Sequence, residues 1–188
     1  MCKQTELEIA TNKFEQSKKF EVDLNVDIQH FVTMCYNRLK PCSYGNWIQR
    51  KIAYDIGAYN IQPSKNKGDI LLRKTFYEVK SSFLGKTNGY RITHLRLWQE
   101  VKFYMICFVD CENSFQPEFY VVDKLVLHKM NLCAMNGTTD ANSKNLNVEL
   151  SVTIKKNDTN HNLLKKYNLM KGNTYNDLIL FSENTKLY

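Results

Sequence analysis

The sequence predicts an α/β protein with a mixed central sheet flanked by helices, and two observations support this fold class. Short apolar runs rich in strand-forming residues recur between residues 69 and 154. Segments with the four-residue spacing of an amphipathic helix are interleaved with them. The 188 residues, 43% of them hydrophobic, can bury a core and are expected to form one domain spanning residues 1–188.

The N-terminal part of the chain, residues 6–40, is expected to be mostly helical. Apolar residues alternate between Phe20 and Ile28, so a short strand there stays open as an alternative. Pro41 then interrupts the pattern, because proline cannot donate a helical hydrogen bond.

A second helix is expected after Pro41. Ser43 is a suitable capping residue, and Gly57 is a suitable stop. Between them Ile48, Ile52 and Ile56 are spaced by four residues, which places all three on one face. The sequence therefore predicts an amphipathic helix immediately before the first strand.

A β-hairpin is expected after a polar turn at residues 63–68. Its strands are residues 69–72 and residues 76–82, and Arg73 and Lys74 form the turn. The other expected elements are a loop at 85–89, an extended segment at 91–95, a helix from about Leu97, strands at 105–109, 119–122 and 148–154, a long polar loop at 136–147 and a helix at 163–169.

The charge of the chain favours an anionic partner. The net charge is +7 and the pI is near 9.0, which creates a positive field around the protein. Nucleic acid is the polyanion that a protein with such a field most often binds. A solvated basic surface with no such partner is the alternative that charge alone leaves open.

Cysteine usage and hydropathy favour a cytoplasmic protein without a membrane partner. The six cysteines are scattered and lack Cys-x-x-Cys spacing, so reduced thiols are expected instead of disulfides or a zinc site. No apolar run approaches the roughly 20 residues that cross a bilayer. The first ten residues contain no apolar signal-peptide core.

The expected hairpin brings three charged residues together. Glu78 and Lys80 are two apart on one strand and therefore share a face, while Asp69 begins the partner strand. Two converging carboxylates repel each other unless a cation lies between them. Mg²⁺ is commonly held by one or two carboxylates, with water and phosphate completing its shell, and a neighbouring ammonium can stabilise developing charge. These residues predict phosphodiester hydrolysis, whereas a turn aspartate and a solvated charged strand are the alternative.

The same residues carry a family resemblance. Gly68-Asp69-Ile70 followed by Tyr77-Glu78-Val79-Lys80-Ser81-Ser82 resembles the core of the PD-(D/E)xK nuclease superfamily, particularly type II restriction endonucleases. Residues 44–50 are similar to the helix that leads into that core, and residues 92–99 to the segment that follows it. The resemblance implies a restriction-endonuclease-like catalytic core at about 43–110, and it leaves 111–188 for recognition and dimerisation.

The resemblance also implies roles for individual residues. Asp69 and Glu78 would bind Mg²⁺, and Lys80 would be the catalytic amine. Gln49 stands where many relatives have a glutamate near the metal, so it is expected to hold a metal-bound water, and a second metal site is less expected.

Contacts to DNA are expected from two segments. Arg91, His94, Arg96 and Gln99 follow the catalytic strands, and arginine suits guanine while amide side chains suit adenine. A solvated face is the alternative for these residues. Asn136, Thr138 and Thr139 lie in the long polar loop, which distantly resembles recognition loops, with an ordinary surface loop as the alternative.

Together these interpretations predict a type II site-specific deoxyribonuclease that hydrolyses duplex DNA with Mg²⁺. A palindromic target calls for a two-fold symmetric homodimer with one active site per strand. A cognate DNA methyltransferase is then a functional, not physical, partner. A repair nickase or junction resolvase of the same superfamily, and a basic DNA-binding module without catalysis, remain open as alternatives.

Overall fold

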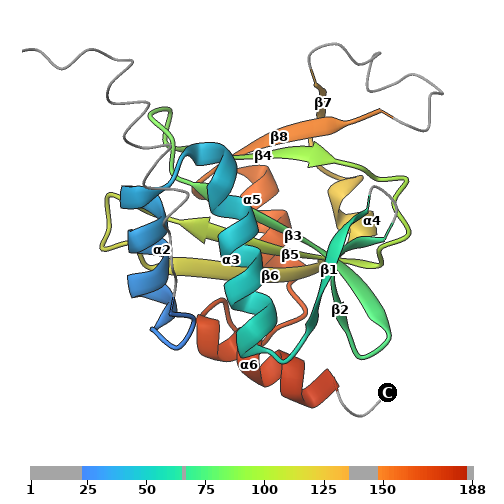
Figure 1. Ribbon diagram of the computed structural model, residues 1–188. Helices are drawn as coiled ribbons and strands as arrows, with labels where there is room; N and C mark the ends of the chain where they lie inside the picture. The colour runs from blue at the N-terminus through green and yellow to red at the C-terminus, as the bar shows by residue number, and fades with distance from the viewer. Residues whose placement is uncertain (1–22, 65–66, 136–147, 186–188) are drawn as a thin grey trace, which may run out of the picture.

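The computed structural model describes residues 23–64, 67–135 and 148–185. Two β-sheets form its centre (Figure 1). The main sheet has the strand order β1-β2-β3-β5-β6, with β1 (Tyr59–Ser64), β2 (Gly68–Leu72), β3 (Thr75–Phe83), β5 (Phe103–Val109) and β6 (Pro117–Asp123). The second sheet has the order β4-β8-β7, with β4 (Gly89–Leu95), β8 (Leu150–Lys155) and β7 (Cys133–Ala134).

The main sheet is mixed, as the sequence predicts. Strands β3 and β5 pair in parallel, and the other neighbours in the sheet pair antiparallel. Between β3 and β5 the chain leaves the main sheet and contributes β4 to the second one. The helices are α2 (Ile28–Arg38), α3 (Pro41–Asp55), α4 (Lys124–Leu127), α5 (Thr159–Lys166) and α6 (Tyr175–Asn184).

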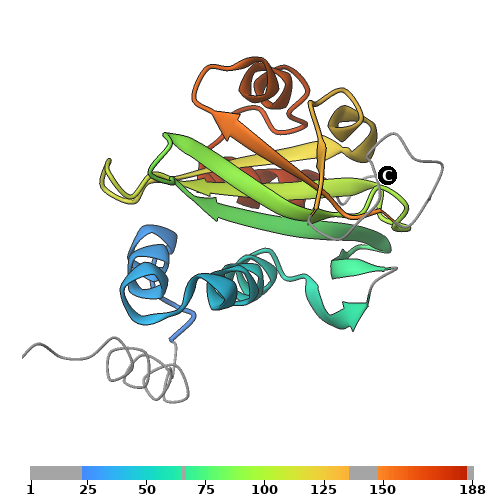
Figure 2. The ribbon, with the colours of Figure 1, turned by 90° about the horizontal axis from the view of Figure 1, so that it is seen from above.

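Two apolar layers cover the two faces of the main sheet. Helices α2, α3 and α6 cover one face, where Ile52 of α3 and Leu178 of α6 join Val79 of β3 in one buried cluster. The second sheet, α4 and α5 cover the other face, where Tyr104 of β5 packs with Ile92 of β4. Figure 2 shows α2 and α3 on one side of the main sheet and β4 and β8 on the other. The predicted α/β class with a helix-flanked mixed sheet is confirmed.

The second sheet was not predicted as a separate unit. The expected strands at 91–95 and 148–154 exist, but they pair with each other, with Arg91 opposite Thr153. The position predicted to end the catalytic core, residue 110, lies between β5 and β6, which are hydrogen-bonded neighbours. The segment after residue 110 therefore supplies strands to both sheets.

The start of α3 differs from the prediction. The helix begins at Pro41 with Lys40 as its N-cap, so Pro41 opens the helix and Ser43 lies inside it. Proline is well suited to the first helical position, because its missing N–H has no partner there and its φ is already helical. The predicted stop is confirmed, since Gly57 has a φ of +64° just beyond the helix end.

Two other predictions near the site are wrong. Residues 97–100 form a turn, not the start of a helix. The backbone N–H of Gln99 donates to the Arg96 carbonyl at 2.9 Å. Strand β5 begins at Phe103, which leaves no room for a helix. The expected turn at 63–68 is partly strand, because β1 continues to Ser64; β1 is an edge strand, where proline is tolerated.

The predictions for the N-terminal and C-terminal regions are partly wrong. Residues 23–27, which overlap the alternative strand at 20–28, are irregular, and Asp27 caps α2. The helix expected at 163–169 begins earlier, after the cap at Asp158. Helix α6 was not predicted, although Thr174 and Asp177 form a capping box. Among the described residues, four cysteines are free thiols, and no helix has the length and apolar character needed to cross a membrane.

Candidate active site

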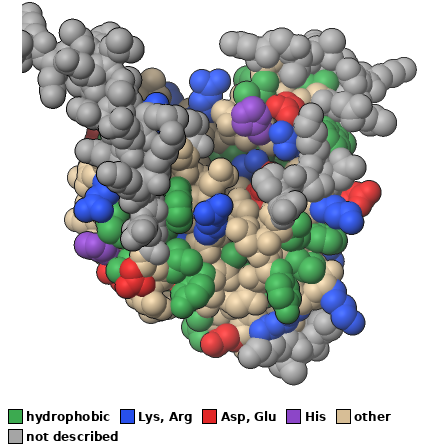
Figure 3. Space-filling model, in the orientation of Figure 1, with side chains coloured by type: hydrophobic (Ala, Val, Ile, Leu, Met, Phe, Trp, Pro, Cys, Tyr) green, Lys and Arg blue, Asp and Glu red, His purple; other side chains and the backbone are tan. Residues whose placement is uncertain are grey.

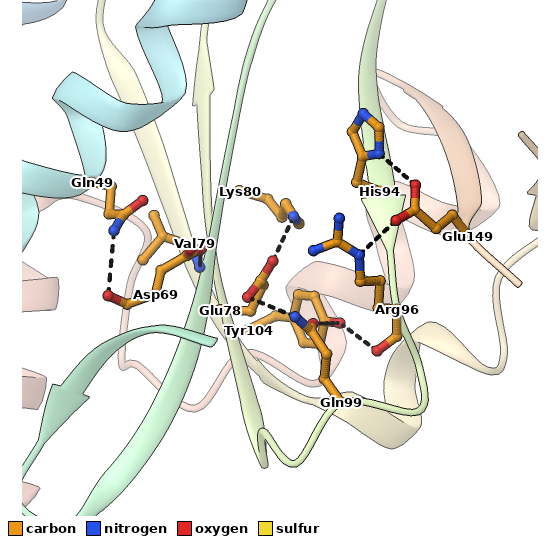
Figure 4. Close-up of polar contacts among 10 residues, drawn as sticks. All are labelled: Gln49, Asp69, Glu78, Val79, Lys80, His94, Arg96, Gln99, Tyr104 and Glu149. Carbon is orange, nitrogen blue, oxygen red and sulfur yellow. Dashed lines mark hydrogen bonds and ion pairs between the residues drawn. The ribbon is translucent and has the colours of Figure 1, made fainter. Parts of the chain in front are cut away.

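The predicted hairpin of β2 and β3 is present and positions the three charged residues. Ile70 pairs with Tyr77, and both side chains lie in the core beneath α3. Because side chains alternate along a strand, Asp69, Glu78 and Lys80 lie on the opposite face of the hairpin. Figure 4 shows Glu78 and Lys80 directed toward the space between the main sheet and the end of β4, and Asp69 beside Val79 and Gln49.

Gly68 determines the backbone conformation immediately before Asp69. Its φ is +75°, a conformation that favours glycine. A Cβ atom there would lie 2.8 Å from the Tyr77 carbonyl oxygen and 2.5 Å from a methyl group of Val101. Any larger residue would therefore displace the strand that carries Asp69.

Asp69 is held through both its side chain and its main chain. Its Oδ2 accepts a hydrogen bond from the Val79 amide at 2.9 Å. Gln49 of α3 donates through Nε2 to the Asp69 carbonyl at 3.3 Å and to Asn60 Oδ1 at 2.7 Å. The predicted site residue Gln49 is thus adjacent to Asp69, but its recorded contacts orient the backbone and not the carboxylate.

Glu78 is buried, with 3% of its surface exposed. Its Oε1 forms an ion pair with Lys80 Nζ at 2.6 Å. Its Oε2 accepts a hydrogen bond from Gln99 Nε2 at 3.4 Å, and Tyr104 donates to Gln99 Oε1 at 3.4 Å. Both oxygens of the Glu78 carboxylate are therefore held by polar contacts, one by Lys80 and the other by Gln99, which Tyr104 contacts in turn.

Gln99 does not have the surface position that a DNA contact requires. Only 1% of its surface is exposed, and its side chain lies between Glu78 and Tyr104. Lys124 Nζ also donates to its carbonyl at 2.6 Å. The structure places Gln99 as a residue that positions Glu78, which replaces the predicted contact with adenine.

Electrostatics couple the two carboxylates. Burial, and then repulsion from Glu78, raise the pKa of Asp69 to about 6, although the Val79 amide and the charges of Lys80 and Arg96 act against that rise. A carboxyl group with this pKa and a second carboxylate nearby would gain strongly from a divalent cation.

Three of the predicted DNA contacts lie in or just after β4: Arg91 is inside the strand, His94 is near its end, and Arg96 follows it. Arg91 and His94 are exposed. His94 has a φ of +53° beside an irregularity in the pairing of β4 and β8, and its Nδ1 lies 2.7 Å from Glu149 Oε2. Arg96 Nε donates to the other oxygen of Glu149 at 2.7 Å. Asn136, Thr138 and Thr139 lie outside the described residues.

Glu149 is the residue that the sequence interpretation missed. It precedes β8 and joins His94 to Arg96 from a position far along the chain. The only local signal is the alternation of Val148, Leu150 and Val152, which are buried and leave Glu149 on the other side.

Asp69 and Lys80 line a cavity of about 490 Å³. This space is many times larger than one water molecule requires, and it can take a hydrated ion and a phosphate group. Its wall includes Gln49 from α3, Asp69 and Lys80 from the hairpin, and Arg91 and His94 from β4. Figure 3 shows this side of the molecule hollowed, with lysine and arginine side chains inside the hollow.

Asp69 and Glu78 offer carboxylate oxygens, which are the ligands that Mg²⁺ prefers. Among the described residues, no group of three or more His, Cys, Asp or Glu side chains is placed to hold a metal. Zinc sites require three or four such ligands, whereas Mg²⁺ often takes one or two carboxylates and leaves the rest to water and phosphate. Asp69 and Glu78 are the residues that would hold it.

Comparison with known proteins adds no family to this picture. No protein-family model and no curated protein matches the chain. The class defined by the fold and the site is therefore an α/β protein with two acidic residues and one lysine on one face of a hairpin.

The raised pKa of Asp69 predicts how stability changes with pH when no metal is present. A carboxyl group whose pKa is higher in the folded state stabilises the fold below its unfolded pKa of 3.8, and this contribution is lost as pH rises through about 6. The free energy of unfolding of Asp69→Asn should therefore rise relative to that of wild type when the pH is raised from 4 to 7.5. Urea unfolding in EDTA at both values measures the difference, and a gap that does not change with pH would contradict the assignment.

Proposed function

We propose that this protein is a magnesium-dependent endodeoxyribonuclease with a restriction-endonuclease-like core. One observation carries the proposal. Asp69, Glu78 and Lys80 share one face of the β2–β3 hairpin, and Asp69 and Lys80 line a cavity large enough for a phosphate group. The net charge of +7 suits a polyanionic substrate.

Bound Mg²⁺ would polarise the phosphate and lower the pKa of a coordinated water. Asp69 and Glu78 would hold the ion, and Gln99 and the Val79 amide would keep these carboxylates oriented. Lys80 Nζ lies 2.6 Å from Glu78 Oε1 and lines the cavity, so its ammonium group would lie beside a phosphate bound there and could stabilise charge that develops on it. Gln49 contributes by fixing the backbone of Asp69.

The finer assignment is a type II restriction enzyme. In such an enzyme, a homodimer would cut both strands of a short palindromic site, and a cognate methyltransferase would protect the host DNA. Arg91 and His94 line the cavity and would contact DNA beside the cut, and the further candidates are Arg96 after β4 and Asn136, Thr138 and Thr139 in the recognition loop. A nickase or junction resolvase would use the same catalytic residues.

The proposal is tested by incubating the purified protein with supercoiled plasmid in Mg²⁺ and sequencing the ends of the products. Discrete linear fragments with one shared end sequence support a type II enzyme. Nicked circles alone favour a repair nickase, and cleavage confined to four-way junctions favours a resolvase. Intact plasmid under all magnesium concentrations would refute the nuclease.

A non-catalytic DNA-binding module is the second candidate, and the Glu78–Lys80 ion pair favours it, because each charge already has a partner. In a purely structural role, this pair would need no metal. Plasmid cleavage by wild type and its loss on adding EDTA separate the two functions.

Both candidates predict salt-dependent binding to duplex DNA. The logarithm of the binding constant should fall with the logarithm of salt concentration, with a slope of about −0.9 for each phosphate neutralised. Arg91→Gln should make the slope less negative by about 1, because Arg91 is exposed at the cavity. Arg73→Gln, which alters the far turn of the hairpin, should leave the slope unchanged. Fluorescence anisotropy in Ca²⁺ measures both slopes, and equal slopes for wild type and Arg91→Gln would remove Arg91 from the interface.

A further inference from the structure

Arg96 is a fourth charged residue beside Asp69, Glu78 and Lys80, and it comes from the second sheet. It follows the last residue of β4, and its side chain is 21% exposed. Its backbone is held, because Gln99 N and Tyr104 Oη both donate to the Arg96 carbonyl, at 2.9 and 3.4 Å. The side chain therefore extends from a fixed point.

Glu149 fixes the direction of the Arg96 guanidinium. Nε donates to Glu149 Oε1 at 2.7 Å, while the other oxygen of the same carboxylate lies 2.7 Å from His94 Nδ1. Because both oxygens of Glu149 are engaged, the carboxylate cannot rotate freely. The pKa of Glu149 is lowered, first by the hydrogen bond from His94 and then by that from Arg96.

The Nη groups of Arg96 face the site. Figure 4 shows them directed toward Lys80 and Glu78, on the side away from Glu149. Within the described part of the chain, Glu149 is the recorded acceptor of the guanidinium, and it uses Nε alone. Arginine has five N–H donors, so the four on the Nη atoms remain for a ligand beside Lys80 and Glu78. The Arg96 charge also acts on Asp69, whose pKa it lowers.

We propose that Arg96 is a further catalytic residue whose Nη groups bind the non-bridging oxygens of the scissile phosphate, and that Glu149 is the positioning residue that aims it. The inference rests on the proposed nuclease function. A guanidinium is planar and permanently charged, and its paired donors match two phosphate oxygens.

The expected action is electrostatic. In hydrolysis the water oxygen bonds to phosphorus and releases a proton to solvent, the bond from phosphorus to one bridging oxygen breaks, and that leaving oxygen takes up a proton from solvent. Negative charge grows on the phosphate oxygens and bridging oxygens during this step. Arg96 gives up no proton and stabilises that charge from the side opposite the hairpin, which would complement Lys80.

The test is a single-turnover measurement on preformed complexes. The duplex carries the site mapped by plasmid cleavage, binding is established in Ca²⁺, and excess Mg²⁺ starts the reaction. Arg96→Gln should lower the rate of the bound complex by a factor on the order of 10², with little change in binding or melting temperature. Arg73→Gln is the matched control, since Arg73 also donates to a protein oxygen, the Glu183 carbonyl, and should keep the wild-type rate.

Glu149→Gln should also slow the bound complex, and the double variant with Arg96→Gln should be no slower than Arg96→Gln alone, because Glu149 acts through Arg96. Additive losses would overturn the positioning role. An Arg96→Gln rate within about threefold of wild type would overturn the catalytic role. If Arg96→Gln does not fold, Arg96→Lys decides, because lysine keeps the ion pair with Glu149 but lacks the paired donors. A loss of about tenfold or more then supports the proposal, and an unchanged rate refutes it.

Failure of this inference is distinct from failure of the proposed function. Wild-type protein that leaves DNA intact in Mg²⁺ refutes the nuclease and Arg96 together. Wild-type cleavage that Arg96→Gln does not slow refutes only the role of Arg96.

Discussion

Asp69→Asn and Glu78→Gln should each abolish DNA cleavage in Mg²⁺, with the loss exceeding about 10²-fold, while the fold and DNA binding persist. Both substitutions preserve side-chain shape. The Asn side chain still accepts from the Val79 amide, and the Gln side chain still accepts from Gln99. What each variant loses is one negative charge and one anionic oxygen ligand for the ion.

The measurement is single-turnover cleavage combined with magnesium binding by calorimetry. Glu100→Gln is the matched control, because Glu100 is an exposed carboxylate close in sequence and outside the cavity wall. It should cleave at the wild-type rate. If Asp69→Asn or Glu78→Gln cut DNA as fast as Glu100→Gln, the assignment of the metal ligands would be wrong.

Lys80→Ala should reduce the cleavage rate of the bound complex by a factor on the order of 10² or more. Lys80 is 2.6 Å from Glu78, with 15% of its side chain exposed, so its charge is only weakly screened by solvent. If that charge stabilises the transition state, its loss affects the barrier more than ground-state affinity. Specific binding in Ca²⁺ should therefore change far less than the rate.

Lys80→Arg should not restore the rate, because guanidinium is larger, planar and effectively never deprotonated. Three results separate three roles for Lys80. A slower bound complex with normal affinity supports catalysis, and weaker binding with a normal bound rate indicates a phosphate anchor. No effect on either would mean that Glu78 and Lys80 form a structural ion pair.

The hairpin was predictable because its signals are local. Strand-forming residues flank Arg73 and Lys74, and alternation within β3 alone places Glu78 and Lys80 on one face. Arg73 and Lys74 adopt positive φ values of 48° and 70°, as two-residue hairpin turns of the favoured type require. Two strands and their turn are enough to predict where Asp69, Glu78 and Lys80 lie.

The rest of the site was not predictable because it depends on distant contacts. Nothing near Glu149 in the sequence indicates that it binds Arg96 and His94, since the pairing of β4 with β8 brings them together. The burial of Gln99 likewise depends on Tyr104 and Lys124, which belong to later elements. A helix was expected from about Leu97, but β4 ends at Leu95 and β5 begins at Phe103, where it pairs in parallel with β3.

The chain leaves the main sheet after β3, forms β4 in the second sheet and returns as β5. This path also determines when the site forms during synthesis. Parallel pairing of β3 with β5 closes a loop that contains β4, and β4 has its own partner only once β8, residues 150–155, has been made. Contacts between segments so far apart form slowly and late in folding. On the ribosome, Asp69, Glu78 and Lys80 are thus translated long before Glu149 can orient Arg96. A nascent chain that stops short of Glu149 would carry the acidic hairpin and Arg96 without the carboxylate that contacts the arginine, and proteolysis of ribosome-bound chains of increasing length would follow that assembly.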